Sequence, residues 1–520
     1  MATTLQDMVR QSGISTDQIR AALVRLQGSR TRGKKVLPPA IEASKGRIAL
    51  AYLAQSERDF AFHLLRLVKP VEQLSVPAQT SGRKDAEQDL AVERAAQNAV
   101  SIVTGGPGRG KTHVVNRIIA MYDAAGLCSF DATGLAAPTG KAAIRMRELC
   151  GGRAASTIHR LLKFHPEAGF RYDTTVEPEF SPTGMWLRGG PVPFQVVIID
   201  ETSMVDIELG AALVRGIETG TRLVFVGDVD QLPSVGAGRV LYDLIQSGVI
   251  PVTRLLTIHR TAADSGIPYV ADDINNGRAP TFEGRAGCSF VEADEVDEVI
   301  AEVLSQVRDA LARGVAARDI QVLAPQKERG AGVEALNVAL KAALNPSDFT
   351  AVTIGSKYQV HVGDKVIHMH NNYQLAEEGR SEGTFNGEIG FVTQAAPGGI
   401  PEASLGNAIR SDACGGKTPA VIVVDFGDRQ VAYTKTEAMD LALAYCVTGH
   451  KFQGSQARVI IVVCHEAHAF TLTRSWTYTA ATRSSEQLIF VGQLSALAKA
   501  VRNTRGTERG TDVQALLRAA

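Results

Sequence analysis

The sequence predicts an α/β protein in which parallel sheets are covered by helices. From residue 86 onward, short β-branched runs such as Val100–Thr104, Val196–Asp200 and Val459–Cys464 alternate with helical patterns. This alternation is typical of β-α-β units, whose strands are buried on both faces. The 520 residues also exceed what one hydrophobic core can serve and indicate three or four domains at about 150 residues each.

The composition is that of a globular chain, with 45% hydrophobic and 21% charged residues, which excludes a fibrous protein and wholesale disorder. No apolar run approaches the roughly 18 residues of a membrane span, and the start, MATTLQDMVRQ, lacks the features of a signal peptide. The six cysteines are scattered without a C-x-x-C pair. We therefore expect a reduced, cytoplasmic chain that does not contact membranes. Because 55 basic residues balance 55 acidic ones, net charge neither indicates nor excludes a polyanionic partner.

Changes in sequence pattern along the chain predict its domains. The first part looks mostly helical, and a polar run at 79–85 resembles a linker. Residues 165–194 are rich in proline, glycine and aromatic side chains, and residues 350–434 show short strands and glycine turns typical of a small β-barrel. The predicted parts are a helical region 1–85, a first α/β domain 86–262 with an insert 165–194, a second α/β domain 263–349 and 435–505, a β insert 350–434 and a tail 506–520.

A glycine-rich motif carries the clearest functional signal. The pattern G-x-x-x-x-G-K-T follows a predicted strand and precedes a predicted helix, so its backbone amides can surround phosphate groups. Lys111 is expected to reach the β- and γ-phosphates and Thr112 to bind Mg²⁺. The residues expected to bind nucleotide here are Gly105, Gly106, Pro107, Gly108, Arg109, Gly110, Lys111, Thr112 and His113.

Two carboxylates end the apolar run Val196–Ile199 and complete this chemistry. A hydrolytic enzyme of the P-loop class needs one carboxylate for the Mg²⁺ shell and a second to activate water. We assign Asp200 to the metal and Glu201 to the general base. The site is therefore predicted to use ATP and Mg²⁺.

Several further segments resemble the motifs of RecD-like helicases of superfamily 1B. Leu223–Gly238 resembles motif III, and its Leu-Pro-Ser-Val-Gly continuation is what makes the resemblance specific. Gln88 lies where this family carries its adenine-reading glutamine. The other matching segments are Ala137–Ala143 (motif Ia), Ser156–Leu162, Thr257–Arg260 (motif IV), Phe385–Gly390, Ala444–Ser455 (motif V) and Tyr478–Arg483 (motif VI).

The resemblance implies two RecA-like domains with ATP held between them and an SH3-like module at 350–434. It gives Gln231 a catalytic role and makes Arg260 and Arg483 the arginines that stabilise the transition state. It also implies a 5′→3′ motor on single-stranded DNA that acts at duplex junctions. The chain is expected to work as a monomer, with the insert 165–194 serving as a pin that splits the duplex.

The resemblance also points to the strand contacts, because hydroxyls, amides and lysines grip phosphates without reading bases. His159 is a weaker candidate, since a lone histidine is as often structural. The candidates are Pro138, Thr139, Lys141, His159, Thr448, His450 and Lys451.

The sequence departs from the family pattern at four places, which are Arg109 in the P-loop, Thr261 after Arg260, Gly449 in motif V and Ser484-Ser485 after Arg483. The alternatives that stay open are an RNA helicase, a translocase that does not unwind, and an inactive module that only binds nucleic acid. Histidines near 361–370 and 465–468 could suggest metal sites, but their spacing favours a structural reading.

Overall fold

A computed structural model gives the structure of the chain. It describes residues 30–32, 35–37, 41–44, 47–76, 85–128, 133–165, 167–183, 185–258, 265–346, 351–355, 358–372, 375, 383–410, 418–506 and 509–519. The chain divides into two compact units, and each is described by itself. The first unit comprises 1–138, 142–260 and 506–520, and the second comprises 139–141 and 261–505.

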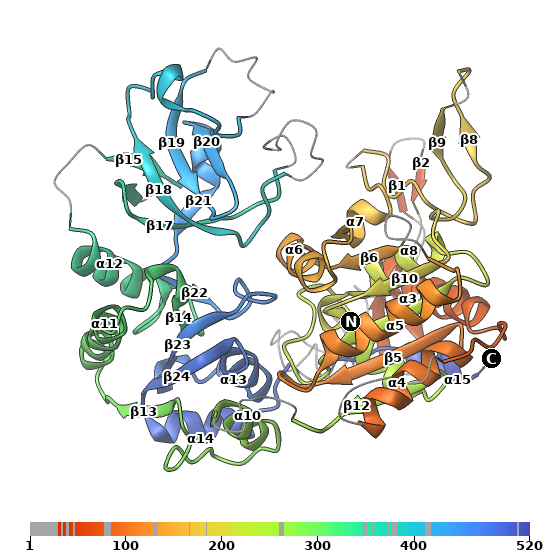
Figure 1. The fold of residues 1–520 in the computed structure, drawn as a ribbon, viewed down its shortest axis with the longest axis horizontal. Coiled ribbons are helices and arrows are strands. Elements are labelled where there is room, and N and C mark those ends of the chain that lie inside the picture. The colour runs from red at the N-terminus through yellow and green to blue at the C-terminus, as the bar shows by residue number, and fades with distance from the viewer. Residues whose placement is uncertain are drawn as a thin grey trace. The chain divides into compact units, whose positions relative to one another are not determined.

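The first unit is built on a six-stranded, fully parallel sheet (Figure 1). In spatial order its strands are β12 (Val252–Leu255), β5 (Val100–Gly105), β11 (Arg222–Gly227), β10 (Val196–Ile199), β6 (Gly134–Ala137) and β7 (Ala155–Thr157). Its helices are α3 (Ala51–Leu67), α4 (Ala86–Gln97), α5 (Lys111–Ala124), α6 (Gly140–Leu149), α7 (Ile158–Leu161), α8 (Ile207–Gly216), α9 (Val240–Ser247) and α15 (Val513–Arg518).

Both faces of this sheet are buried, as the apolar runs in the sequence predict. Along β10, Val197 and Ile199 join a core with α3 and α8, while Val196 and Ile198 join a separate core with α4 and α5. Successive side chains of a strand point to opposite faces, so the two cores lie on the two sides of the sheet. The central strands therefore place their carboxyl ends at a rigid edge.

The prediction that residues 1–85 are mostly helical is wrong for residues 30–50. Two antiparallel hairpins lie there, formed by β1 (Arg30–Arg32) with β2 (Lys35–Leu37) and β3 (Ile41–Ser44) with β4 (Arg47–Leu50). Helix α3 begins only at Ala51. The short apolar runs around these strands fit a helix as well as a strand, so the sequence pattern alone did not separate the two. The predicted linker falls outside the described residues except for Asp85, which caps α4.

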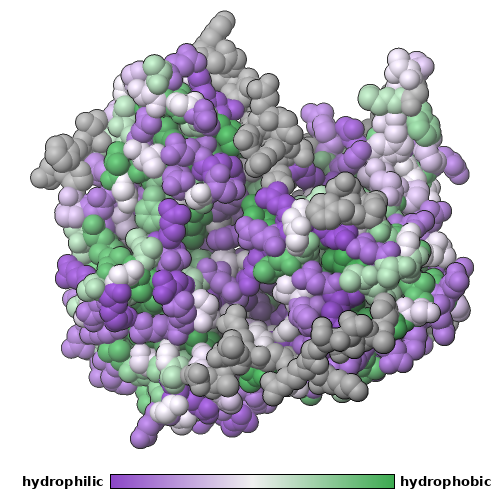
Figure 2. Space-filling view, viewed as in Figure 1, coloured by the Kyte–Doolittle hydropathy of each residue, from purple (hydrophilic) through white to green (hydrophobic). Residues whose placement is uncertain are grey.

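The insert 165–194 contains a short hairpin of β8 (Glu179–Phe180) and β9 (Trp186–Arg188). The insert is expected to serve as a pin, but the structure shows that only part of its aromatic side chains is exposed for that role. Phe170 and Tyr172 pack against the core of the first unit, and Tyr172 stacks on Trp186 with ring centroids 4.5 Å apart. Of the apolar hairpin residues, Phe180 and Met185 stay 57% and 64% exposed, and Figure 2 shows pale and green surface there.

The second unit has its own parallel sheet of five strands. In spatial order these are β13 (Cys288–Glu292), β24 (Ser484–Gly492), β23 (Ala457–Cys464), β14 (Ile320–Ala324) and β22 (Cys446–Thr448). Its helices are α10 (Ile267–Asn275), α11 (Val296–Ala312), α12 (Val333–Leu344), α13 (Arg474–Ala481) and α14 (Leu494–Arg502). Two parallel sheets with flanking helices confirm the predicted α/β class.

The β insert of the second unit contains a five-stranded antiparallel sheet. Its strands are β20 (Gln430–Thr434), β19 (Ala420–Asp425), β18 (Ile389–Ala395), β17 (Lys365–His368) and β21 (Leu441–Leu443), and β15 (Val352–Ile354) pairs separately with β16 (Tyr358–Val360). The predicted end at 434 is too early, because β21 pairs with β17 and its alternate residues are buried. The SH3-like description of this insert stays a prediction.

Residues 506–520 are not a simple tail. Helix α15 packs against α9 and α3 of the first unit and buries Val513 and Leu517, which are spaced four residues apart on one helical face. Gln514 Nε2 donates a hydrogen bond of 2.8 Å to Asp243 Oδ1. The chain thus returns to its first unit after completing the second. In the part of the chain that the structure describes, no helix is long and apolar enough to cross a membrane.

Candidate nucleotide site and strand contacts

The glycine-rich loop joins the end of β5 to the start of α5, as the sequence predicts. Gly108 and Gly110 have φ angles of 71° and 83°, in the left-handed region that glycine adopts without strain. Gly105 needs to be small for another reason, because a Cβ there would lie 2.8 Å from the carbonyl oxygen of Leu255 in β12. The glycines therefore permit both the tight curl of the loop and its close approach to the neighbouring strand.

The side chain of Lys111 is held inside this loop. Its Nζ donates hydrogen bonds to the carbonyl oxygens of Gly105 at 2.6 Å and Gly106 at 3.0 Å. The backbone amides of Lys111, Thr112 and His113 open α5 and have no acceptor among the described residues. Free amides at a helix N-terminus beside a positioned ammonium group fit the phosphate groups of a nucleotide.

Asp200 and Glu201 follow β10 at the same carboxyl edge of the sheet. Asp200 Oδ1 accepts a 2.8 Å hydrogen bond from the Glu201 amide. Burial, reinforced by the Glu201 carboxylate, raises the pKa of Asp200 to about 6, whereas Lys111 and Arg145 act to lower it. A carboxylate in this surrounding is stabilised by a nearby cation.

The backbone at Glu201 is also unusual. Its φ of 50° lies in the left-handed region, which costs a non-glycine residue about 1–3 kcal/mol. Such outliers concentrate at functional sites, and here the conformation turns the chain from β10 into the short 3₁₀ turn Thr202–Met204. Glu201 thus sits on a strained corner beside the metal candidate.

Asp228 is a buried acid in the motif III segment that the sequence did not single out. Its Oδ2 accepts a 3.0 Å hydrogen bond from Gln231 Nε2, which fixes the side chain of this predicted catalytic residue. Burial raises the pKa of Asp228, and the charge of Lys111 opposes that rise. An acid directly after the buried strand β11 repeats the pattern of Asp200 after β10, and this repetition could have identified it.

These groups suit Mg²⁺ with a nucleotide. Among the described residues, no cluster of three or more histidine, cysteine, aspartate or glutamate side chains could hold a metal. Mg²⁺ is usually bound by one or two protein groups together with phosphates and water. Thr112 and Asp200 fit that limited role.

The adenine-reading candidate Gln88 is buried in the first turn of α4, whose start is capped by Asp85. Its neighbour Glu87 accepts hydrogen bonds at Oε2 from the amides of Leu256 at 2.6 Å and Thr257 at 3.0 Å. Arg109 Nη1 donates to the carbonyl oxygen of Leu256 at 2.9 Å. The P-loop and α4 therefore hold the same backbone segment, and neither tie follows from motif spacing.

The two arginines predicted to stabilise the transition state have different outcomes. Arg260 lies outside the described residues. Arg483 is buried in the second unit, where its guanidinium donates to the carbonyl oxygens of Thr479 at 3.2 Å and Ser455 at 3.4 Å. These contacts tie the end of α13 to the motif V segment.

The motif V candidates form a turn that follows β22. The Lys451 amide lies 3.4 Å from Thr448 Oγ1, and Lys451 Nζ donates to Asn386 Oδ1 at 2.9 Å. His450 is exposed. Gly449 explains one departure from the family, since a Cβ there would meet the Trp476 indole nitrogen at 2.7 Å. Pro138, Thr139 and Lys141 lie at the end of β6 and the start of α6.

His159 lies in an aromatic cluster, with its ring centroid 5.4 Å from that of Phe164 and 5.6 Å from that of Phe170. Burial lowers the pKa of its imidazole, so the ring is held neutral. This environment is compatible with a structural role.

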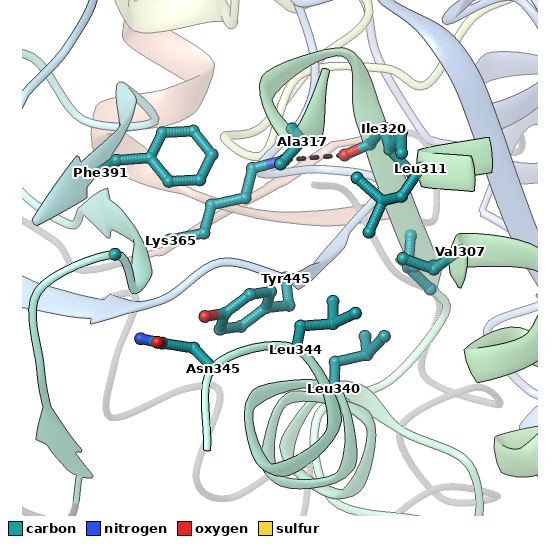
Figure 3. Close-up of a pocket in the computed structure, with 12 residues that line it drawn as sticks. Val307, Leu311, Ala317, Ile320, Leu340, Leu344, Asn345, Lys365, Phe391 and Tyr445 are labelled. Carbon is teal, nitrogen blue, oxygen red and sulfur yellow. Dashed lines mark hydrogen bonds between the residues drawn. The ribbon is translucent and has the colours of Figure 1, made fainter. Parts of the chain in front are cut away.

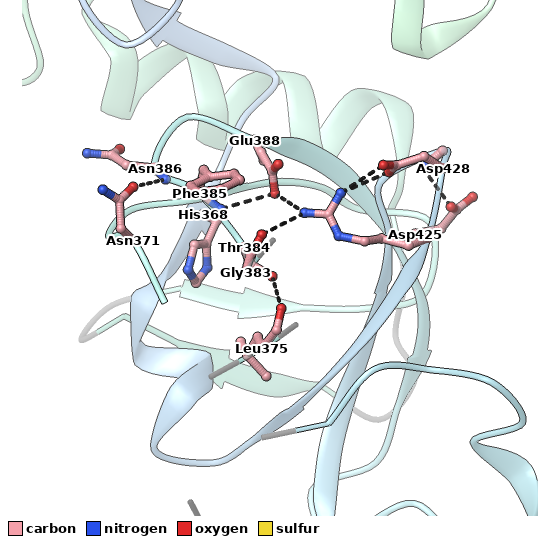
Figure 4. Close-up of polar contacts among 12 residues, drawn as sticks. His368, Asn371, Leu375, Gly383, Thr384, Phe385, Asn386, Glu388, Asp425 and Asp428 are labelled. Carbon is pink, nitrogen blue, oxygen red and sulfur yellow. Dashed lines mark hydrogen bonds and ion pairs between the residues drawn. The ribbon is translucent and has the colours of Figure 1, made fainter. Parts of the chain in front are cut away.

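Asn386 belongs to a polar network of the β insert (Figure 4). The Asn386 amide donates to Asn371 Oδ1 at 2.9 Å, and the buried Glu388 carboxylate accepts from Arg429 at 2.6 Å and from the Phe385 amide at 3.2 Å. The network fixes the turn from which Asn386 reaches Lys451. The matched segment Phe385–Gly390 thus supports a motif V side chain within the second unit.

Comparison with known proteins identifies the family. Residues 88–237 match the AAA domain model, and residues 443–491 match the UvrD-like helicase C-terminal domain. The chain is 31% identical over 464 residues to the ATP-dependent RecD2 DNA helicase of Deinococcus radiodurans, covering 88% of this chain but 57% of that protein. It is 30% identical to the RecBCD enzyme subunit RecD of Mycolicibacterium smegmatis, covering 84% of this chain and 75% of that protein.

The corresponding subunit of Mycobacterium tuberculosis is also 30% identical, with 80% of this chain and 70% of that protein covered. A solved Pif1 helicase from Bacteroides, bound to ADP-AlF3 and single-stranded DNA, aligns at 18% identity with a TM-score of 0.44, covering 79% of this chain and 92% of that one. The extended matches at 30% identity decide the assignment. The chain belongs to the RecD-like helicases of superfamily 1.

Proposed function

We propose that the protein is an ATP-dependent DNA helicase that moves 5′→3′ on single-stranded DNA and unwinds duplexes. The observation that carries this proposal is the meeting of Lys111, Asp200 and the Asp228–Gln231 pair at one edge of the first sheet. Because the side chains that this edge would supply for ATP hydrolysis are all present, we disfavour the alternative of an inactive protein that only binds nucleic acid. The chain spans 57% of the length of its Deinococcus relative, so the activity of the whole protein is part of this proposal.

Each group at this edge has a defined task in hydrolysis. When bound, Mg²⁺-ATP supplies the phosphoryl group that is transferred to water. Lys111 and the amides of α5 would neutralise phosphate charge, while Thr112 and Asp200 would hold the cation. Glu201 would accept the proton of the attacking water, Gln231 would orient the γ-phosphate, and Arg260 and Arg483 would supply positive charge as negative charge develops.

Strand binding is proposed to use phosphate contacts only. Thr139 and Lys141 at the start of α6, and Thr448, His450 and Lys451 after β22, are side chains suited to phosphates rather than to base edges. Because such contacts do not detect the 2′-hydroxyl, they leave an RNA helicase as the alternative substrate class.

The hairpin β8–β9 is the proposed pin at the fork. Its exposed apolar side chains Phe180 and Met185 can stack on an opened base pair, whereas Phe170 and Tyr172 hold its base to the core. The test is therefore Phe180→Ala with Met185→Ser rather than deletion of the insert. We expect strand-stimulated hydrolysis to persist and unwinding to fall. A translocase that does not unwind would show no change.

The decisive assay is strand displacement on duplexes with a 5′ or a 3′ overhang, each made in DNA and in RNA. The proposal requires displacement from the 5′-overhang DNA and little from the other three substrates. Displacement of RNA alone would support the RNA helicase, and hydrolysis without displacement would support a translocase.

A further inference from the structure

A cavity of about 280 Å³ lies in the second unit, and none of the residues assigned to nucleotide or strand lines it (Figure 3). It is formed where α11, α12 and β14 meet the β insert at β17 and β18. Most of its wall is apolar, from Val307, Leu311, Val322, Leu340, Leu344 and Phe391. Its size lies just below the usual range for ligand pockets, which is roughly 300–1,000 Å³.

One charged side chain lines this apolar cavity. Lys365 is only 3% exposed, and its Nζ donates to the carbonyl oxygens of Ile320 at 2.7 Å and Ala317 at 3.2 Å. The amine also lies 6.0 Å from the centre of the Phe391 ring. Within the described residues no carboxylate forms an ion pair with Lys365, which is unusual for a buried lysine.

The other polar groups of the wall are already paired. Asn345 Nδ2 and the Tyr445 hydroxyl each donate to Asp364 Oδ1 at 2.8 Å. The same aspartate forms an ion pair with Lys341, whose amine also approaches His361. Asp364 is therefore committed to Lys341, and the amine of Lys365 is the polar group of the wall that lacks an opposite charge.

We propose that this cavity binds a small monocarboxylate with an apolar body, whose carboxylate pairs with Lys365. The apolar side chains of α11 and α12 would surround the body, and burial away from water strengthens the ion pair. Since about 10–15 Å³ of this kind of volume holds one water molecule, the cavity has room for a small organic molecule. Because α11 and α12 belong to the parallel core and β17 and β18 to the insert, the ligand would bridge these two parts.

Proton uptake gives this site a specific signature. Burial, together with the charge of Lys141, lowers the pKa of Lys365 to about 7, although the charge of Asp319 opposes this shift. A carboxylate stabilises the ammonium form, so binding above pH 7 should draw a proton from solution. Uptake should approach about one proton per ligand at pH 8 and roughly half a proton at pH 7. A neutral ligand should draw none.

The test is calorimetric titration of the full chain with hexanoate at pH 8, in two buffers that differ in ionisation enthalpy. We compare 1-hexanol as the neutral probe, Lys365→Met as the variant without the amine, and Lys435→Met as the matched variant at an exposed lysine. Hexanoate binding with proton uptake, and an affinity at least about tenfold lower for Lys365→Met but not for Lys435→Met, would support the site.

A second variant guards against misfolding, because Lys365→Met would leave two carbonyl oxygens without their donor. Leu340→Trp fills the cavity from α12 and keeps the amine. It should therefore abolish hexanoate binding, while the melting temperature and the basal rate of ATP hydrolysis stay at their wild-type values. The proposal fails if hexanoate binds Leu340→Trp normally, if binding takes up no proton, or if 1-hexanol binds as tightly as hexanoate. It does not depend on the helicase proposal, since binding is measured without nucleotide or DNA.

Discussion

Two loops in this protein occupy the same topological position and differ in what they leave available. In the first unit a loop joins β5 to α5, and in the second unit a loop joins β14 to α12. At the start of α12, the amides of Val333 and Glu334 donate to the carbonyl oxygens of Gln326 and Lys327, each at 3.0 Å. At the start of α5, the first three amides have no such acceptor among the described residues. A strand, loop and helix thus make a phosphate site only when the loop leaves its amide donors free.

Buried charges separate the two units in the same way. In the second unit, Glu388 pairs with Arg429 and Asp364 pairs with Lys341. In the first unit, the charge of Lys111 acts on Asp200 and Asp228, while burial raises the pKa of both acids. Ion pairs within the protein stabilise the fold, whereas buried acids of raised pKa beside a P-loop lysine mark a candidate functional site. The following substitutions test this distinction.

The largest effect is expected for Glu201→Gln. Loss of the general base should lower kcat for ATP hydrolysis by about 10²–10⁴-fold while nucleotide binding persists. Steady-state hydrolysis and equilibrium binding of a fluorescent nucleotide measure the two quantities. Glu334→Gln, at the capped start of α12, is the matched control and should stay within about twofold of the wild-type rate. If Glu201→Gln hydrolysed ATP at the wild-type rate, Glu201 would not be the general base.

Lys111→Ala should lower hydrolysis by about 10²–10³-fold and also weaken ATP binding, because it removes the ammonium group that the P-loop holds. Lys327→Ala removes a lysine from the equivalent loop of the second unit and should leave strand-independent hydrolysis nearly unchanged. Measuring both variants at several ATP concentrations separates binding from turnover. If both variants lost ATP hydrolysis equally, the two loops would have the same role, contrary to the difference in their amide hydrogen bonds.

Arg429→Met should act on stability instead. It leaves the buried Glu388 carboxylate without its partner, which costs about 3–5 kcal/mol. Chemical denaturation should show the loss, while the nucleotide affinity of the folded protein stays at the wild-type value. The double variant with Glu388→Gln should recover part of the stability. If Arg429→Met had wild-type stability but bound nucleotide weakly, this ion pair would serve nucleotide binding and not the stability of the fold.

The candidate nucleotide site could be assembled from the sequence because its residues lie in short local motifs. The P-loop glycines and the two acids after an apolar strand identify both backbone conformation and charge, and the structure brings Lys111 and Asp200 close enough to interact. The parallel sheets were predictable for the same local reason. Helix α15 was not predictable, because a stretch of six residues does not reveal that it packs against α9, which is far away in the sequence. The hairpins at 30–50 were missed because their short apolar runs also fit a helix.

The cavity and the ties to Leu256 could not be found from the sequence, since they depend on contacts between distant segments. Lys365 is an ordinary lysine in a strand pattern, and its isolation from carboxylates follows only from the packing of α11 and α12 around it. Arg109 was recognised as a departure from the family pattern, but its partner lies in another strand connection. Tertiary contacts of this kind decide whether a departure from the family sequence pattern weakens a site or only changes the contacts that position it.

Arg109 gives the smallest predicted effect and the finest test of the first loop. Its guanidinium holds the Leu256 carbonyl at 2.9 Å, while Glu87 holds the Leu256 and Thr257 amides from the other side. A hydrogen bond of this kind contributes about 0.5–1.5 kcal/mol, so Arg109→Thr should raise the KM for ATP by roughly two- to tenfold and leave kcat nearly unchanged. Glu87→Ala should act in the same direction.

Because both side chains hold one backbone segment, their effects should be coupled. The double variant should lose more or less than the sum of the single losses by at least about 0.5 kcal/mol in a double-mutant cycle on kcat/KM. Arg117→Ala is the control, since Arg117 pairs with Asp89 on the same helix α4 but does not contact Leu256. Strict additivity of Arg109→Thr and Glu87→Ala would show that the two ties act independently, and that Arg109 does not support the P-loop jointly with Glu87 through Leu256.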